Sequence, residues 1–254
     1  MLADRLLEHV LSFSLKDVRL PAGVGVLDPF NGPQAAEVER IVTLFHKRFY
    51  SDDRKRVLML GINPGRLGAG STGLSFTDTK RCESDLGIAV NGLRTHEPSS
   101  DFFYRMIHAA GGVDAFYSKV YVHAICPLGF VKESAAGSPP KAGETRSRSG
   151  EQAARGAINL NYYDDKALEG AVTPFVENWL RTLVRCGMRT DVVFCIGTGK
   201  NAAYFTKLNE RLGLFDRIIA LEHPRFVMQY KARQLDSYLL KYTNALAEVT
   251  EGVR

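Results

Sequence analysis

The residues best suited to chemistry lie in one short loop, Gly61–Gly68, which reads GINPGRLG and directly follows the apolar run Val57–Leu60. A strand that ends in such a turn holds the amide of Asn63 at the mouth of a rigid pocket floor, because Pro64 and the flanking glycines fix the backbone around it. An amide in that place can orient a reacting group. The alternative is an ordinary strand-to-loop turn, in which Asn63 only stabilises the backbone.

The elements that must position this loop can be identified from the pattern of apolar residues. Four short runs rich in β-branched residues predict strands, at residues 57–62, 120–125, 192–196 and 217–221. Helical patterns precede, separate and follow them, at residues 3–14, 34–46, 101–110, 172–186, 201–212 and 229–249. Strands that alternate with helices favour right-handed crossovers. We therefore expect one α/β domain over residues 1–254, with three α/β/α layers and a central four-stranded parallel sheet.

Ligands of such sheets bind beyond the carboxyl ends of the strands. Four loops rich in Gly, Pro, Asn or His lie there, at residues 61–76, 126–130, 197–201 and 222–226. Three of these regions together resemble the uracil-DNA glycosylase superfamily. The stretch Gly61–Phe76, continued to Leu86–Ile88, resembles the first motif of its single-strand-selective monofunctional branch. Val122–Leu128 resembles the middle motif of that branch, and His223–Arg225 resembles its second catalytic motif.

The motifs differ in which branch of the superfamily they indicate. The pentapeptide Gly61–Gly65 is shared with the mismatch-specific thymine/uracil glycosylases, whereas Cys-Pro-Leu at 126–128 and His-Pro at 223–224 resemble the single-strand-selective branch. Ala124 stands where that branch has an asparagine that reads the uracil edge, and no Ser-Pro follows the His-Pro. These departures predict a divergent sub-branch with a broadened or shifted base preference, because a site that lacks such hydrogen bonds discriminates less.

The resemblance implies a role for each loop residue. Asn63 positions the attacking water, and His223 donates a hydrogen bond to a uracil carbonyl oxygen as negative charge develops. Phe76 stacks on the extruded base, whose carbonyls face the backbone N–H groups of Ala69 and Gly70. The other residues that it places around the base are Gly61, Ile62, Pro64, Gly65, Ala124 and Cys126. The structural alternatives are a buried histidine at 223 and a core phenylalanine at 76.

Four side chains are candidates for contact with DNA, namely Arg66, Lys200, Arg225 and Phe226. Arg225 or Phe226 would fill the gap left by a flipped nucleotide, from a protruding loop after His223. Phe226 could instead pack the following helix onto the core. The segment Gly197–Asn201 lacks the full spacing of a nucleotide-binding P-loop, but its turn and Lys200 could bind a DNA phosphate or serve the fold alone.

Composition narrows the class of protein. A net charge of +5 over 254 residues permits a polyanionic partner. The four cysteines have no metal-ligand spacing, and the expected reaction needs neither metal nor cofactor. Residues 133–156 contain almost nothing that could be buried and predict a mobile basic loop within the domain. The sequence shows neither a membrane-spanning stretch nor a signal-peptide pattern, so we expect a cytoplasmic monomer with no membrane contact.

We therefore expect a monofunctional DNA glycosylase that removes uracil from single- or double-stranded DNA and so initiates base excision repair, with a range that could extend to other deaminated bases. No lysine is placed to form a Schiff base with the sugar, so the strand should stay intact. Two alternatives remain open. One is a mismatch-specific thymine/uracil-type glycosylase, favoured by the pentapeptide Gly61–Gly65 and by Ala124, and the other is a non-catalytic nucleic-acid-binding module on the same fold.

Overall fold

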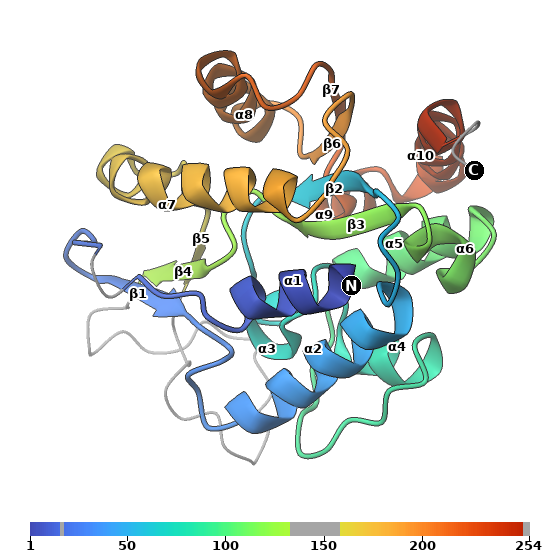
Figure 1. Cartoon of the computed structure of the whole chain (residues 1–254), viewed down its shortest axis with the longest axis horizontal. Coiled ribbons are helices and arrows are strands. Elements are labelled where there is room, and N and C mark those ends of the chain that lie inside the picture. Colours follow the sequence, from blue (N-terminus) through green and yellow to red (C-terminus); the bar gives the residue numbers. More distant parts are fainter. Residues whose placement is uncertain (16–17, 133–157, 251–254) are drawn as a thin grey trace.

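A central sheet of four parallel strands organises the protein (Figure 1). The computed structural model describes residues 1–15, 18–132 and 158–250. The strands, in the order β3-β2-β6-β7, are β2 (Val57–Gly61), β3 (Val120–Ala124), β6 (Val193–Ile196) and β7 (Ile218–Leu221). All four predicted strands are confirmed, and β2, β3 and β6 are buried at every position, which explains their nearly continuous apolar sequences.

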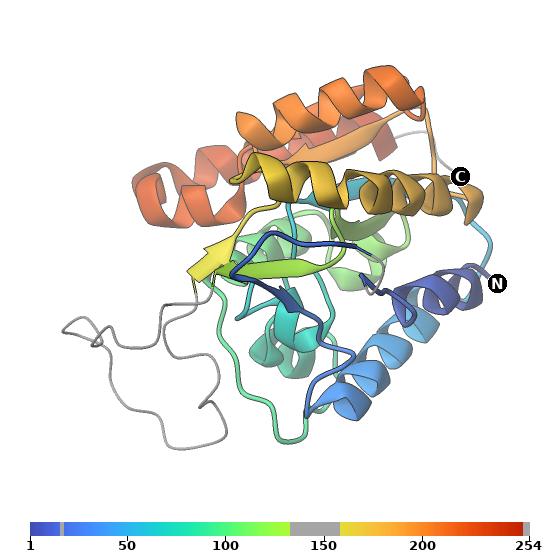
Figure 2. The same ribbon diagram turned by 90° about the vertical axis from the view of Figure 1, so that its left-hand side faces the viewer.

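Helices lie on both faces of this sheet, as Figures 1 and 2 show, and the predicted α/β/α class is confirmed. Their bounds are α1 (Leu2–Val10), α2 (Ala35–Phe49), α3 (Ala69–Thr72), α4 (Thr79–Ser84), α5 (Pro98–Ala109), α6 (Val113–Tyr117), α7 (Lys166–Arg185), α8 (Lys200–Leu212), α9 (Pro224–Tyr230) and α10 (Leu235–Thr250). Within the described ranges, no helix is both long and apolar enough to span a bilayer.

Helix α7 begins at Lys166, ahead of the predicted start at 172. The reason is a cap: the carboxylate of Asp165 accepts hydrogen bonds from the N–H groups of Ala167 at 2.8 Å and Leu168 at 2.9 Å. These bonds satisfy two of the amides that a helix start leaves without partners.

The C-terminal part of the chain differs more from the prediction. The single helix expected at 229–249 is divided into α9, a short 3-10 turn at Ala232–Gln234, and α10. Because α9 begins at Pro224, the prediction of a protruding loop after His223 is wrong. Arg225 and Phe226 are instead exposed on the first turn of a helix.

A second, antiparallel sheet is absent from the sequence-based prediction. In the order β1-β4-β5 it contains β1 (Val24–Leu27), β4 (Gly129–Lys132) and β5 (Ile158–Leu160). A Cβ atom added to Gly129 would lie 2.2 Å from the carbonyl oxygen of Pro64, so the backbones meet where only glycine fits. The small sheet therefore packs directly against the loop that carries Asn63. The basic loop predicted at 133–156 lies outside the described residues.

Candidate active site

The amide of Asn63, half-buried just beyond β2, is held by backbone groups on two sides. Its Nδ2 donates to the carbonyl oxygen of Leu160 at 3.1 Å, and its Oδ1 accepts from the N–H of Tyr162 at 3.1 Å. Leu160 ends β5, so the second sheet supplies this support. The two bonds fix the plane of the amide and leave one acceptor position on Oδ1. An amide held in this way can accept a hydrogen bond from a water.

Phe76 links the loop after β2 to His223, the second residue after β7. Its ring stacks on Phe103 of α5, with centroids 4.6 Å apart, and its centroid lies 5.5 Å from that of His223. Gly61 leaves room for the ring, because an added Cβ would lie 3.0 Å from Phe76 Cζ. The φ angle of Phe76 is 54°, a region that bulky residues seldom adopt and that is often found at functional sites.

His223 precedes α9 as its N-cap residue, and its Nδ1 accepts from the N–H of Arg225 at 3.2 Å. A neutral imidazole has one acceptor nitrogen and one donor nitrogen, so the proton of His223 lies on Nε2. Burial, together with the positive charge of Arg225, lowers the pKa of His223 to about 4. The ring is therefore neutral at pH 7 and offers its Nε2–H as a hydrogen-bond donor.

These groups lie at the same edge of the central sheet. β2 and β7 are parallel and have only β6 between them, so their carboxyl ends are about 10 Å apart, two inter-strand spacings. The ring of Phe76 bridges that interval, since it packs against both Gly61 and His223. The edge thus combines a fixed amide with a neutral N–H donor. Such a pair can orient a water on one side of a ligand and stabilise negative charge on the other.

The two backbone amides assigned to the base differ in their surroundings. The N–H of Gly70 donates to the carbonyl oxygen of Gly65 at 2.9 Å and is engaged within the loop. Ala69 is the first residue of α3, so its N–H has no acceptor inside that helix. Ile62 packs toward the loop after β6, where a Cβ added to Gly197 would lie 3.6 Å from Ile62 Cδ1.

The middle motif contributes buried residues. Ala124 pairs with Gly61 across the sheet, and its carbonyl oxygen accepts from the indole N–H of Trp179 at 3.1 Å. The thiol of Cys126 donates to the carbonyl oxygen of Leu128 at 3.5 Å, and burial raises its pKa to about 12. Cys126 is therefore a protonated thiol at pH 7, which excludes it as a thiolate nucleophile.

The candidate DNA contacts come from three elements. Lys200 is exposed as the first residue of α8, and Arg225 and Phe226 are exposed in the first turn of α9. Arg66 is half-buried and its Nε donates to Oδ1 of Asn159 at 3.2 Å. Lys200, Arg225 and Phe226 are exposed beyond the carboxyl edge of the sheet.

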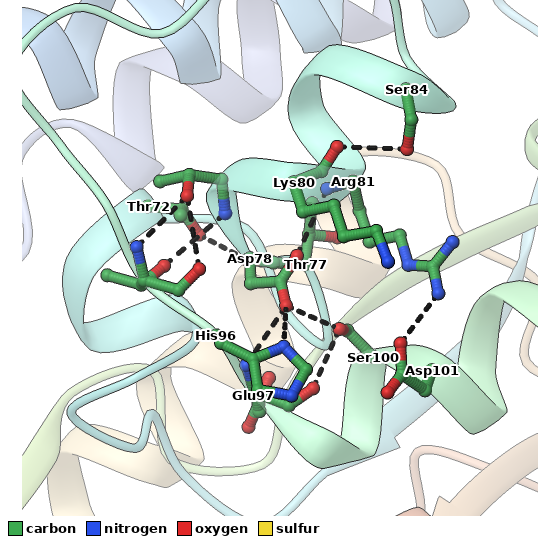
Figure 3. Close-up of polar contacts among 12 residues, drawn as sticks. Thr72, Thr77, Asp78, Lys80, Arg81, Ser84, His96, Glu97, Ser100 and Asp101 are labelled. Atoms are coloured by element: carbon green, nitrogen blue, oxygen red, sulfur yellow. Dashed lines mark hydrogen bonds and ion pairs between the residues drawn. The ribbon is translucent and has the colours of Figure 1, made fainter.

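Sequence reasoning missed one acidic residue beside the first motif. The carboxyl group of Glu97 packs against Gly68, where an added Cβ would lie 2.2 Å from Oε2. An acid directly before Pro98, at the start of α5, is typical of a helix cap and gives no separate signal of function. In the structure its carboxyl group forms no such cap, and its N–H donates to Oδ2 of Asp78 (Figure 3).

Comparisons with known proteins agree with this geometry. The family model of the uracil DNA glycosylase superfamily matches residues 48–247. The crystal structure of wild-type Pedobacter heparinus SMUG2 is similar, with 39% sequence identity, coverage of 99% of each chain and a TM-score of 0.88. No curated protein matches the chain. The resemblance predicted from the three motifs is confirmed, and the matches support a DNA glycosylase, a hydrolase that acts on DNA. The chain belongs to the uracil-DNA glycosylase superfamily.

Proposed function

We propose that this protein hydrolyses the N-glycosidic bond of uracil in DNA and thereby starts base excision repair. The observation that carries the proposal is the state of His223. Its Nδ1 is occupied by the N–H of Arg225 and its pKa lies near 4, so a neutral ring offers Nε2–H at the edge of the sheet. A neutral N–H donor suits a leaving group that becomes an anion, because its hydrogen bond stabilises the developing negative charge and the ring does not have to be protonated first.

Cleavage begins with departure of the base. As the bond between the sugar and the base nitrogen lengthens, positive charge develops on the sugar and negative charge on the carbonyl oxygens of the base. The Nε2–H of His223 donates to one of these oxygens. A single donor of this kind lowers the barrier by about 3 kcal/mol in other enzymes.

Asn63 acts on the other reactant, the water. Its Oδ1 has one free acceptor position while Leu160 and Tyr162 hold the amide in place. A hydrogen bond from the water to Oδ1 orients the water oxygen toward the sugar carbon. The amide does not take the proton, which passes to solvent after attack, and the released uracil anion takes up a proton from solvent. The products are free uracil and an abasic site in an intact strand.

The base itself is proposed to lie against Phe76, with the N–H of Ala69 facing one of its carbonyls. Stacking on an aromatic ring contributes about 1–3 kcal/mol per base. Ala124 offers no hydrogen-bonding side chain to the base edge, which supports activity on uracil and on other deaminated bases. Arg225 and Lys200 would hold the phosphates of a single or a double strand.

The test is an assay of abasic-site formation on synthetic DNA. The substrates are uracil in a single strand, in U·A and in U·G pairs, together with T·G, hypoxanthine and xanthine. The proteins are the unaltered chain, Asn63→Ala, and Asn244→Ala as a matched control, since Asn244 is exposed on α10. We expect the control to cleave like the unaltered chain, and Asn63→Ala to lose about 100-fold or more.

The outcomes separate the alternatives. Release of thymine from T·G pairs, with uracil in single strands left intact, would favour the mismatch-type enzyme to which the absence of an amide at Ala124 points. An unaltered protein that forms no more abasic sites than Asn63→Ala would indicate a nucleic-acid-binding module and end the enzymatic proposal.

A further inference from the structure

The segment that holds Asn63 is a short strand with little support of its own. The partners of the Asn63 amide are the carbonyl oxygen of Leu160 and the N–H of Tyr162, at the end of β5 and just beyond it. β5 has three residues and stands at the edge of its sheet, with Ile158 and Asn159 exposed. Strands this short contribute little stability by pairing alone. The position of Asn63 therefore depends on what anchors Leu160 and Tyr162.

The side chain of Tyr162 provides such an anchor. Its ring is fully buried, and the ring centroid lies 4.7 Å from that of Tyr204. Its Oη donates to Oδ1 of Asn201 at 2.7 Å. Burial raises the pKa of Tyr162, so the hydroxyl keeps its proton and is the donor in this bond. One residue thus reaches Asn63 through its backbone and Asn201 through its side chain.

Asn201 connects this anchor to the central sheet. It is fully buried in the first turn of α8, and its Nδ2 donates to the carbonyl oxygen of Ile196 at 3.2 Å and to Sγ of Cys195 at 3.4 Å. Because a carbonyl oxygen can only accept, the amide is oriented with Oδ1 toward Tyr162. Gly197 leaves room for this arrangement, since an added Cβ would lie 3.3 Å from Nδ2 of Asn201.

These bonds form a closed connection between two neighbouring strands, because β2 and β6 pair directly in the sheet. From the end of β2 the connection passes through Asn63 to Tyr162. It continues through Asn201 and returns to Ile196, the last residue of β6. Buried hydrogen-bond networks whose members all have partners are rigid. The plane of the Asn63 amide is therefore tied to the sheet at both ends.

We propose that Tyr162 and Asn201 are positioning residues of the active site, and that the hydrogen bond between them fixes the backbone N–H that orients the amide of Asn63 toward the attacking water. The inference rests on the proposed function, in which Asn63 orients that water. Neither side chain is placed to touch the reactants. Loss of their hydrogen bond should therefore slow the chemical step and leave the binding of DNA unchanged.

The first experiment compares the chemical step with binding. Single-turnover release of uracil from a single-stranded oligonucleotide gives the rate constant. Binding of the same strand with 2′-fluorinated deoxyuridine, which resists hydrolysis, gives the dissociation constant. Tyr162→Phe should lower the rate constant about tenfold, because a water that is held less firmly is less often in position to attack. It should change the dissociation constant by less than about twofold.

Tyr50→Phe is the matched control. Tyr50 is also fully buried, and its hydroxyl donates to the carbonyl oxygen of Val120 at 3.1 Å. Val120 begins β3, so this bond lies at the opposite edge of the sheet from Asn63. Tyr50→Phe loses a comparable buried hydrogen bond and should release uracil at the native rate. An equal loss of rate in the two variants, or a native rate in Tyr162→Phe, overturns the proposal.

A double-mutant cycle tests the route of the effect. In an Asn63→Ala background, Tyr162→Phe should change the remaining rate by less than about twofold, because no amide is left to orient. Tyr162→Phe should likewise add less than about twofold to the loss in Asn201→Ala, because the acceptor of its hydroxyl is gone. A loss near tenfold that persists in the Asn63→Ala background overturns the proposal.

A readout without activity separates this inference from the proposed function. Hydrogen exchange of the backbone N–H at position 162, followed by NMR, reports on the bond to Oδ1 of Asn63. This exchange should be about tenfold faster in Tyr162→Phe than in Tyr50→Phe, and equal exchange in the two variants overturns the link. A chain that shows the faster exchange but whose native form releases no uracil would refute the proposed function and leave the link from Asn201 to Asn63 standing.

Discussion

Two substitutions at His223 separate its structural role from its chemical role. The imidazole has two jobs: Nδ1 accepts the N–H of Arg225 as the cap of α9, and Nε2–H is free to donate. Asparagine is a good N-cap residue but has a shorter side chain, so His223→Asn should keep the cap while its amide no longer reaches the position of Nε2–H. His223→Ala loses both. The first variant should therefore match the stability of the native protein, and the second should be about 1 kcal/mol less stable.

The magnitudes follow from the geometry. Removal of one donor to a developing anion costs about 3 kcal/mol, so both variants should release uracil more slowly by about 100-fold to 1,000-fold. The pKa of His223 is about 4, three pH units below neutrality, so about one ring in a thousand is protonated at pH 7. The native rate should therefore show no step from this imidazole between about pH 6 and pH 9. It should respond to His223 only as the pH approaches about 4.

The assay is single-turnover release of uracil from an oligonucleotide, with urea unfolding of each variant as the stability measurement. His223→Asn is the decisive protein because it isolates the donor. If it retains a rate within about threefold of the native chain, Nε2–H contributes nothing to the barrier and the reasoning fails. A titration step near the ordinary histidine value of 6.5 that disappears in His223→Asn would show that the ring is not held neutral.

Three further predictions concern the groups around this pair. The rise in the pKa of Glu97 from 4.5 to about 7 corresponds to about 3 kcal/mol. This contribution to the free energy of unfolding is present below pH 4.5, the pKa in the unfolded state, and is lost as pH rises through about 7. The free energy of unfolding of Glu97→Gln, measured with urea, should therefore depend less on pH than that of the native chain, and an equal pH dependence would contradict the prediction. Gly61→Ala should force the ring of Phe76 to move, at a cost of about 1–2 kcal/mol by thermal unfolding. Gly170→Ala in α7, where an added Cβ meets nothing within 4 Å, is its control and should stabilise slightly. The logarithm of the DNA-binding constant should fall linearly with the logarithm of the salt concentration, and Lys200→Ala should reduce the magnitude of that slope by about one; an unchanged slope removes Lys200 from the interface.

The parts of the fold that could be predicted are those whose cause is local. β2 and β6 are buried along their whole length, so each reads as an apolar run between turn residues. The second sheet could not be found in this way, because Val24–Leu27 pairs with Gly129–Lys132, about a hundred residues away. Strands of three or four residues carry little pattern of their own, and their pairing supplies the stability. The same limit hid the support of Asn63, which comes from Leu160 and Tyr162.

The two acids Asp78 and Glu97 show a different limit of sequence-based prediction, because their roles depend on how two helices meet. Asp78 and Glu97 are both plausible caps by sequence, since each directly precedes the first residue of a helix. In the fold Asp78 caps α4 and also accepts the N–H of Glu97, whereas the carboxyl group of Glu97 forms no capping bond. Asp78 is fully buried, and its oxygens accept hydrogen bonds from residues of α4 and α5 at once. The carboxyl group of Glu97 is left against Gly68, beside the reacting loop. Which acid stays structural is decided by how α4 and α5 meet, and the sequence of neither helix contains that information.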